Sequence, residues 1–270
     1  MIRKIVKAGN SSHTISLPKE WIERHNLSKG DHVIIHDSEG VLTVAPYEQK
    51  HSAVKEFVID ASLPLSDVRR LVTGAYMKNY SSIALQGVVK LDHKKIFSNF
   101  PAMEIIEESA NRIVAKDVLD PESVDVKTSL KRMDMMVRTM FDSLKNKETF
   151  KMEEQDFELN KLYFLLNKVL RRIVSGSLSS SLKAEEVFSV WTIVQALEGV
   201  ADGLKSGVSN AKSLEELYRD SVTAYHTGDV KLAQSVIERA KSDNAKGSDR
   251  YVQESITSIA RAVLNEADNG

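Results

Sequence analysis

Along the first fifty residues, apolar and polar positions alternate in short runs, as in strands with one buried face. The runs that predict strands are residues 2–7, 14–17, 33–35 and 41–44. Turn clusters separate these runs at Gly9-Asn10-Ser11-Ser12, Ser28-Lys29-Gly30-Asp31 and Ser38-Glu39-Gly40. Pro18 begins a short helix over 19–25, since a proline at the first helical position gives up no hydrogen bond. So small a unit buries little surface alone, and we expect two chains to interleave their strands as a dimer.

The spacing of apolar residues changes over residues 53–119, where runs typical of strands alternate with runs typical of helices. The predicted strands are 54–59, 82–85, 103–107 and 112–115, and the predicted helices are 66–79, with Ser66 as its cap, and 92–97. The order strand, helix, strand, helix, strand, strand predicts a small α/β layer. This segment contains neither a glycine-rich phosphate loop nor a catalytic motif.

From Pro121 onward the apolar residues recur three and four apart, which is the period of amphipathic helices. Pro121 follows Asp120 at a predicted helix start. The predicted helices are 124–145, 150–174, 184–209, 213–226, 229–243 and 248–266. Short loops between long helices predict an antiparallel bundle, and six helices divide into two repeats of three. The expected fold is α+β and multidomain, with domains at 1–47, 53–119 and 121–266.

Composition narrows the function classes. The 270 residues are 42% hydrophobic and 28% charged, with a net charge of -1 and no cysteine. Disulfides, cysteine zinc fingers, iron–sulfur clusters and thiol catalysis are therefore excluded. No run approaches eighteen uninterrupted apolar residues, so we expect a cytoplasmic protein without membrane insertion. With no His–Glu pair at metal spacing, no phosphate loop and no nucleophile motif, we do not expect an enzyme.

Charge is distributed unevenly within the first fifty residues. Residues 1–30 carry six basic side chains opposed only by Glu20 and Glu23: Arg3, Lys4, Lys7, Lys19, Arg24 and Lys29. Residues 31–50 reverse this balance. A positive end, doubled in a dimer, suits contacts to DNA phosphates. Charge alone leaves open the alternative of a solvated basic face.

The order of residues in this segment resembles the SpoVT–AbrB family. The resemblance rests on Gly9-Asn10-Ser11-Ser12, then Ile15-Ser16-Leu17-Pro18-Lys19 with Trp21, then Leu27-x-x-Gly30-Asp31, and covers residues 1–47. It implies a homodimeric swapped-hairpin β-barrel that binds double-stranded DNA through the first strand, the following turn and the helix start. The positions that match these elements are Arg3, Lys4, Lys7, Asn10, Ser11, Ser12, Lys19 and Arg24. We assign Trp21 to the dimer core, since large apolar residues usually pack, and His13 to an exposed loop.

Two acidic or amide pairs lie on the predicted bundle helices. Glu198 and Asp202, and likewise Asp156 and Asn160, are four residues apart and so share a helix face. Bundles bind metals through carboxylates from facing helices. An acidic pair beside an apolar stripe is also typical of a solvated helix edge, and spacing alone leaves both interpretations open.

The bundle segment resembles a PhoU domain, a phosphate-uptake regulator built as a duplicated three-helix bundle. The matching stretches are Asp156 with Asn160-Lys161-Leu162-Tyr163-Phe164, Ala196-Leu197-Glu198-x-x-Ala201-Asp202, Gly228-Asp229-x-x-Leu232-Ala233 and Val236-Ile237-Glu238-Arg239. The resemblance implies a divalent metal or iron held by Glu198, Asp202, Asp156 and Asn160. The amide in place of a carboxylate marks a degraded site, and the second repeat departs further from the pattern. Fusions of AbrB-type with PhoU-like domains are typical of archaea, and residues 100–117 fit that architecture.

These features together predict a DNA-binding transcriptional regulator linked to phosphate supply. Its bundle would sense a signal or bind a phosphate transport or signalling protein, and shift DNA affinity by linkage. The alternative is a dimeric PhoU-like scaffold that does not bind DNA and regulates a phosphate transporter or sensor.

Overall fold

The computed structural model describes residues 2–9, 12–38, 41–47, 56–88, 92–178, 180, 182–243 and 245–267. The chain divides into two compact units, Met1–Ala53 and Val54–Gly270. The predicted turn residues Asn10, Ser11, Glu39 and Gly40, and the strand start at 54–55, lie outside the described residues.

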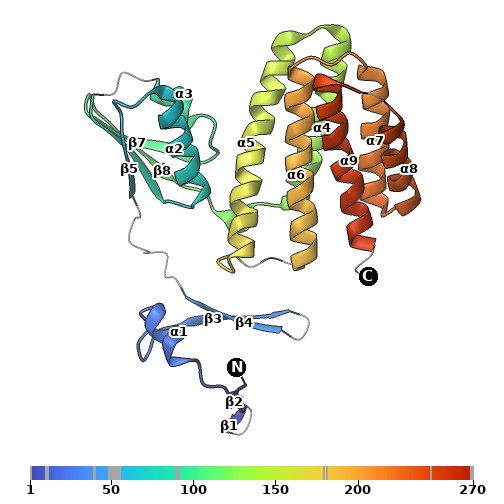
Figure 1. Ribbon diagram of the computed structural model, residues 1–270. Helices are drawn as coiled ribbons and strands as arrows, with labels where there is room; N and C mark the ends of the chain where they lie inside the picture. The colour runs from blue at the N-terminus through green and yellow to red at the C-terminus, as the bar shows by residue number, and fades with distance from the viewer. Residues whose placement is uncertain are drawn as a thin grey trace. The chain divides into compact units, whose positions relative to one another are not determined.

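The N-terminal unit consists of two antiparallel hairpins joined by a short helix (Figure 1). Strand β1 (Val6–Ala8) pairs with β2 (Ser12–Thr14), helix α1 spans Lys19–Arg24, and β3 (Val33–Ser38) pairs with β4 (Val41–Pro46). The predicted order is confirmed, but the strand expected at 14–17 is displaced to Ser12–Thr14. Thr14 lies opposite Val6, the first residue of β1, and β1 therefore offers no partner beyond it.

The second unit begins with a four-stranded sheet in the order β5-β6-β8-β7. Its elements are β5 (Glu56–Asp60), α2 (Leu65–Met77), β6 (Ser82–Gln86), α3 (His93–Phe97), β7 (Met103–Glu108) and β8 (Arg112–Asp117). β5 and β6 are parallel and the other pairs are antiparallel. The predicted α/β order is confirmed. The predicted cap Ser66 is wrong: Pro64 occupies the N-cap of α2 and Ser66 lies inside its first turn, whereas Asp92 caps α3 by accepting from the Lys95 amide.

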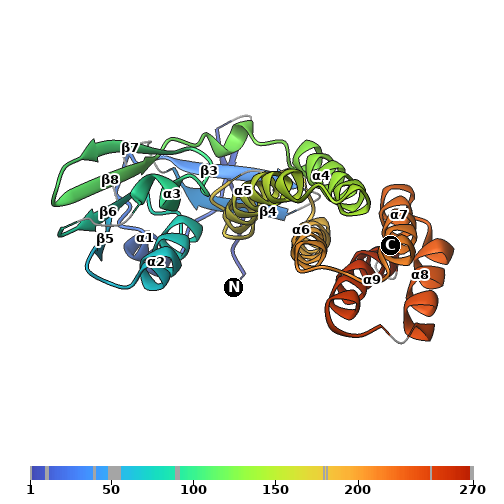
Figure 2. The same cartoon turned by 90° about the horizontal axis from the view of Figure 1, so that it is seen from above.

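The remainder of the described chain is helical. The long helices are α4 (Val126–Asn146), α5 (Thr149–Val174), α6 (Ala184–Lys205), α7 (Ala211–Thr227), α8 (Val230–Ser242) and α9 (Gly247–Ala267). Viewed from above, α4, α5 and α6 form one group and α7, α8 and α9 another, with α6 beside α9 (Figure 2). Pro121 starts only a 3₁₀ turn, η1 (Pro121–Ser123), and Asp125 caps α4. Helix α6 ends four residues before its predicted end, since Gly207 has a φ of +87° and ends the helical path.

Helix α5 joins the sheet layer to the helices. Its Phe164 ring lies 5.1 Å from the ring of Phe100. Its Lys168 is fully buried, pairs with Asp117 at the end of β8, and has its Nζ 4.0 Å from the ring centroid of Tyr76 on α2. Residues 54–270 therefore form one packed unit, with a core on each side of α5.

Helix α6 is the one helix among the described residues that is long and apolar enough to cross a membrane. Its apolar window is 67% buried inside the bundle. Burial to that extent is typical of a central helix in a folded bundle, because its apolar side chains already contact other helices.

Candidate nucleic-acid interface

The described part of the N-terminal unit contains no buried residue. Large apolar side chains are instead exposed along both hairpins: Ile2, Ile5, Val6, Ile15, Ile35, Val41, Leu42 and Tyr47. An isolated two-stranded hairpin is marginally stable in water. Two such hairpins with unburied apolar faces therefore need a further surface to cover them, as the predicted interleaved dimer would.

Four basic side chains in the described part of this unit are available to a ligand. Arg3 and Lys4 precede β1, Lys7 lies within it, and Arg24 ends α1, and each is exposed. None of these four has an ion pair or side-chain hydrogen bond with another described residue. Exposed, unpaired cations of this kind are what phosphate contacts require.

Lys19 is placed differently. Its Nζ lies 3.4 Å from Glu23 one helical turn away, with the lysine side chain 87% exposed. Exposed pairs of this kind contribute little stability, so a phosphate could displace the carboxylate at small cost. The carboxylate still lowers the positive potential at the start of α1.

The turn after β1 is described only in part. Asn10 and Ser11, both expected to contact DNA, lie outside the described residues. Ser12 is exposed, and its hydroxyl donates to the Ala8 carbonyl at 2.6 Å. That bond closes the hairpin, and Gly9 supplies the left-handed conformation with a φ of +74°.

The two aromatic residues singled out by sequence differ in exposure. Trp21 is half-buried on α1, with its ring centroid 4.9 Å from that of His25. Its assignment to a dimer core stays a prediction. His13 is exposed as expected, although it lies in β2 rather than in a loop.

The acidic residues of the bundle come together between α5 and α6. Glu198 and Asp202 share a hydrogen bond, and Asp156 is close enough to raise the pKa of both. Burial is the largest cause of the shift at Glu198, and together with the neighbouring Asp202 and Asp156 it raises the pKa of Glu198 from 4.5 to about 7. Asp156 is 4% exposed, its Oδ2 accepts from Lys205 Nζ at 2.5 Å, and its Oδ1 has no partner. Asn160 is half-buried one turn further along α5.

This donor set does not suit a metal ion as arranged. A hydrogen bond between the Glu198 and Asp202 carboxyl groups requires a proton on one of them, and Lys205 already supplies a cation to Asp156. Among the described residues, no group of three or more acidic or histidine side chains has the geometry to hold one ion. The metal site at Asp156, Asn160, Glu198 and Asp202 therefore stays a prediction, which Lys205 disfavours.

The two lysines that pair with buried or nearly buried aspartates of the second unit were not identified from the sequence. Lys205 lies seven residues after Glu198, two helical turns along the same face, and that spacing could have identified it. The pair between Lys168 and Asp117 joins residues 51 positions apart, and no local pattern indicates such a contact.

Comparison with known proteins assigns part of the chain. Residues 6–50 match the family described as "Antidote-toxin recognition MazE, bacterial antitoxin". No curated protein and no solved structure matches the chain. The match covers the N-terminal unit and leaves residues 54–270 without an assigned relative. The chain thus begins with a MazE/AbrB-like domain, an antitoxin type of domain, which is consistent with a DNA-binding regulator.

Proposed function

We propose that the protein is a homodimeric transcriptional regulator that binds double-stranded DNA through its N-terminal unit. The observation that carries the proposal is the combination of exposed, unpaired Arg3, Lys4 and Lys7 with a match to an antitoxin-type domain over residues 6–50. Lys19, Arg24, Ser12 and the turn residues Asn10 and Ser11 complete the proposed contact surface.

The proposed dimerisation is supported by the exposed apolar side chains of the same unit and by the lack of buried side chains among its described residues. A second copy would cover the exposed apolar faces of the hairpins and double the number of cations available to one duplex. The swapped-hairpin barrel suggested by the sequence is one way to achieve both.

The bundle of this regulator is proposed to be the part that responds to a signal. Its resemblance to a PhoU domain supports a link to phosphate supply and to a phosphate transport or signalling partner. Because α5 is packed into the sheet layer through Phe164 and Lys168, a change in the bundle would reach the start of the second unit. A ligand that binds one dimer geometry more tightly would then shift DNA affinity.

Genome-wide mapping of bound DNA at high and low phosphate tests the proposal. We expect discrete sites for the unmodified protein, their loss in the Arg3→Ala/Lys7→Ala variant, and a change in occupancy with phosphate. Sites that persist in the variant would argue against the N-terminal contact surface, and unchanged occupancy would argue against the phosphate link alone.

A second candidate is a dimeric platform that binds a protein and no DNA. The ion pair between Lys19 and Glu23, with Glu20 beside them, favours it because these carboxylates oppose phosphate binding. The matched family description names toxin recognition, which is a protein contact. This candidate would be favoured if the unmodified protein bound no duplex DNA at low salt. It would also be favoured if only weak nucleic-acid binding were found and Arg3→Ala/Lys19→Ala left its affinity and salt dependence unchanged.

A further inference from the structure

A groove of about 620 Å³ lies between α8 and α9 in the second half of the bundle. Its floor is formed by Ile237 and Ala240 of α8 and by Gln253 and Thr257 of α9. Ala240, Gln253 and Thr257 are each less than a tenth exposed. The volume is within the range of sites for small organic ligands, and the floor combines apolar surface with buried polar groups, as such sites do.

The rim of this groove is basic. Four cationic side chains line it, Lys241, Lys246, Arg250 and Arg261, against two carboxylates. They come from α8, from the loop before α9 and from α9 itself, so the excess of positive charge is assembled by the fold rather than by one sequence run.

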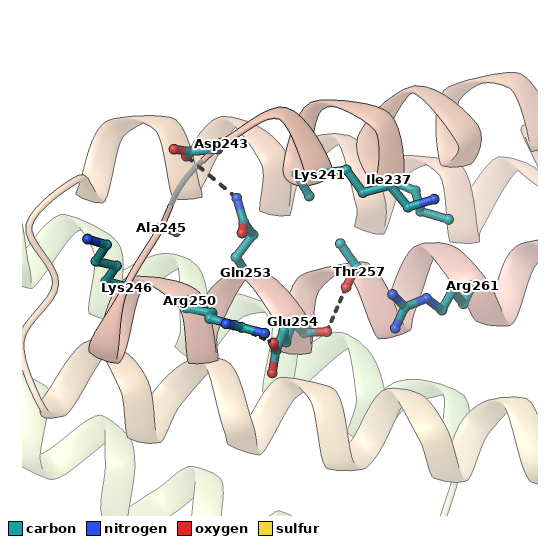
Figure 3. A pocket seen from close by; sticks show the side chains of 11 residues that line it. Ile237, Lys241, Asp243, Ala245, Lys246, Arg250, Gln253, Glu254, Thr257 and Arg261 are labelled. Atoms are coloured by element: carbon teal, nitrogen blue, oxygen red, sulfur yellow. Dashed lines mark hydrogen bonds and ion pairs between the residues drawn. The ribbon is translucent and has the colours of Figure 1, made fainter.

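Both carboxylates of the groove already have partners. Arg250 Nε donates to Glu254 at 2.8 Å, and the Gln253 amide group donates to Asp243 at 3.5 Å, as the dashed lines in Figure 3 show. By contrast, Lys241, Lys246 and Arg261 have no ion pair within the described part of the chain. Figure 3 shows Lys241 and Arg261 reaching from facing helices toward the same end of the groove, with Lys246 near the other end.

We infer that this groove binds a small, multiply charged anion, such as a phosphate ester or a polycarboxylate. Lys241 and Arg261 hold the charged group from opposite sides, since charge-assisted hydrogen bonds are the strongest that an open site offers. Lys246 contacts a second charged group, and Ile237 and Ala240 contact the apolar part of the ligand. A polypeptide or a duplex would need a longer surface than this groove provides.

The groove is lined only by residues of the second unit and shares no residue with the proposed DNA contact surface, so binding of an anion there would be a separate function. Its use as the effector site of the regulator rests on the proposed function, whereas binding of the anion does not.

Titration calorimetry of the full chain with inorganic pyrophosphate tests the inference, and inorganic phosphate serves as the less charged probe. We expect saturable binding of pyrophosphate, weaker binding of phosphate, and affinity for pyrophosphate at least about tenfold lower in the Lys241→Ala/Arg261→Ala variant. Lys231→Ala removes an exposed cation from the same helix outside the groove and is expected to leave the affinity unchanged.

Several outcomes would overturn the inference. They are the absence of saturable pyrophosphate binding, an equal loss in Lys231→Ala, or a Lys241→Ala/Arg261→Ala variant that binds as before. Duplex DNA binding is measured in parallel with the same variants. Pyrophosphate binding without DNA binding would refute the proposed function and leave the groove assignment intact. Loss of DNA binding without any pyrophosphate binding would assign these cations to nucleic acid.

Discussion

Replacing Asp117 by asparagine removes the counter-charge of a fully buried lysine. Lys168 is 0% exposed, and the ion pair with Asp117 joins α5 to the end of β8. Burial is the largest influence on the pKa of Lys168 and lowers it, which means that the site disfavours the free ammonium. Since breaking a buried pair leaves an uncompensated charge, we expect Asp117→Asn to lower the free energy of unfolding by about 3–4 kcal/mol.

Replacing the lysine of this pair instead is expected to lower the free energy of unfolding by less. In Lys168→Met the remaining carboxylate keeps its hydrogen bond from the Leu119 amide at 3.1 Å, and its side chain is 13% exposed. We expect a loss of about 2 kcal/mol. The double variant removes both charges and is expected to lose only about 1–2 kcal/mol, because a buried pair is replaced by neutral groups. The sum of the two single costs would then exceed the double cost by about 4 kcal/mol.

Urea denaturation followed by far-ultraviolet circular dichroism measures these differences. Lys151→Met is the matched control, since its pair with Glu148 is exposed at 49% and 44% and should contribute less than about 1 kcal/mol. A loss below about 1 kcal/mol in Asp117→Asn, or strictly additive costs in the double variant, would refute the interpretation of the pair as a coupling between the sheet layer and the bundle.

Three further predictions concern the bundle and the dimer. Folding raises the pKa of Glu198 from 4.5 to about 7, so the protonated side chain stabilises the folded state. This contribution to the free energy of unfolding is fully present below pH 4.5 and is lost as the pH rises through 7. Between about pH 5 and pH 8 the protein should therefore lose about 1–3 kcal/mol relative to Glu198→Gln in urea titrations, and parallel profiles of the two would contradict this. A Cβ at Gly203 would lie 2.2 Å from Val252 Cγ2 on α9, so Gly203→Ala should lower stability by about 1–3 kcal/mol. Gly74→Ala on α2, where nothing lies within 4 Å, should raise it by about 0.5–1 kcal/mol, and equal effects at the two sites in thermal unfolding would count against the described packing of α6 on α9. Ile35 on β3 is 61% exposed, so Ile35→Asp should convert the proposed dimer to a monomer in analytical ultracentrifugation. Thr43→Asp, on the other face of the hairpin, should leave the dimer intact, and a monomeric unmodified protein would disprove the dimer.

The helical half of the chain was predictable because its signals are local. Apolar spacing and glycine or asparagine breaks placed each long helix of the described chain within a few residues. The predictions were wrong at helix ends, where the backbone conformation of a proline or glycine sets the boundary. Pro64, and not Ser66, occupies the N-cap of α2, and α6 ends before Gly207, which has a left-handed backbone conformation.

The candidate sites were predictable only in part, since they depend on contacts distant in sequence. The acidic residues Glu198 and Asp202 were identified by spacing, but the cation that neutralises Asp156 comes from 49 residues away. The groove between α8 and α9 likewise joins side chains from two helices and a loop. In the N-terminal unit the individual strands were predictable, while no local pattern identifies the surface that covers their exposed apolar side chains.

The salt dependence of duplex DNA binding tests the central claim most directly. Each phosphate contact contributes about 0.9 to the slope of log affinity against log salt, so Arg3→Ala/Lys4→Ala/Lys7→Ala should lower the slope of a dimer by about 5. Lys127→Ala/Lys131→Ala/Lys231→Ala, which removes three exposed cations of the second unit, should leave it unchanged. No duplex binding at low salt, or an equal slope in the unmodified protein and the N-terminal variant, would contradict the account of this protein as a DNA-binding regulator.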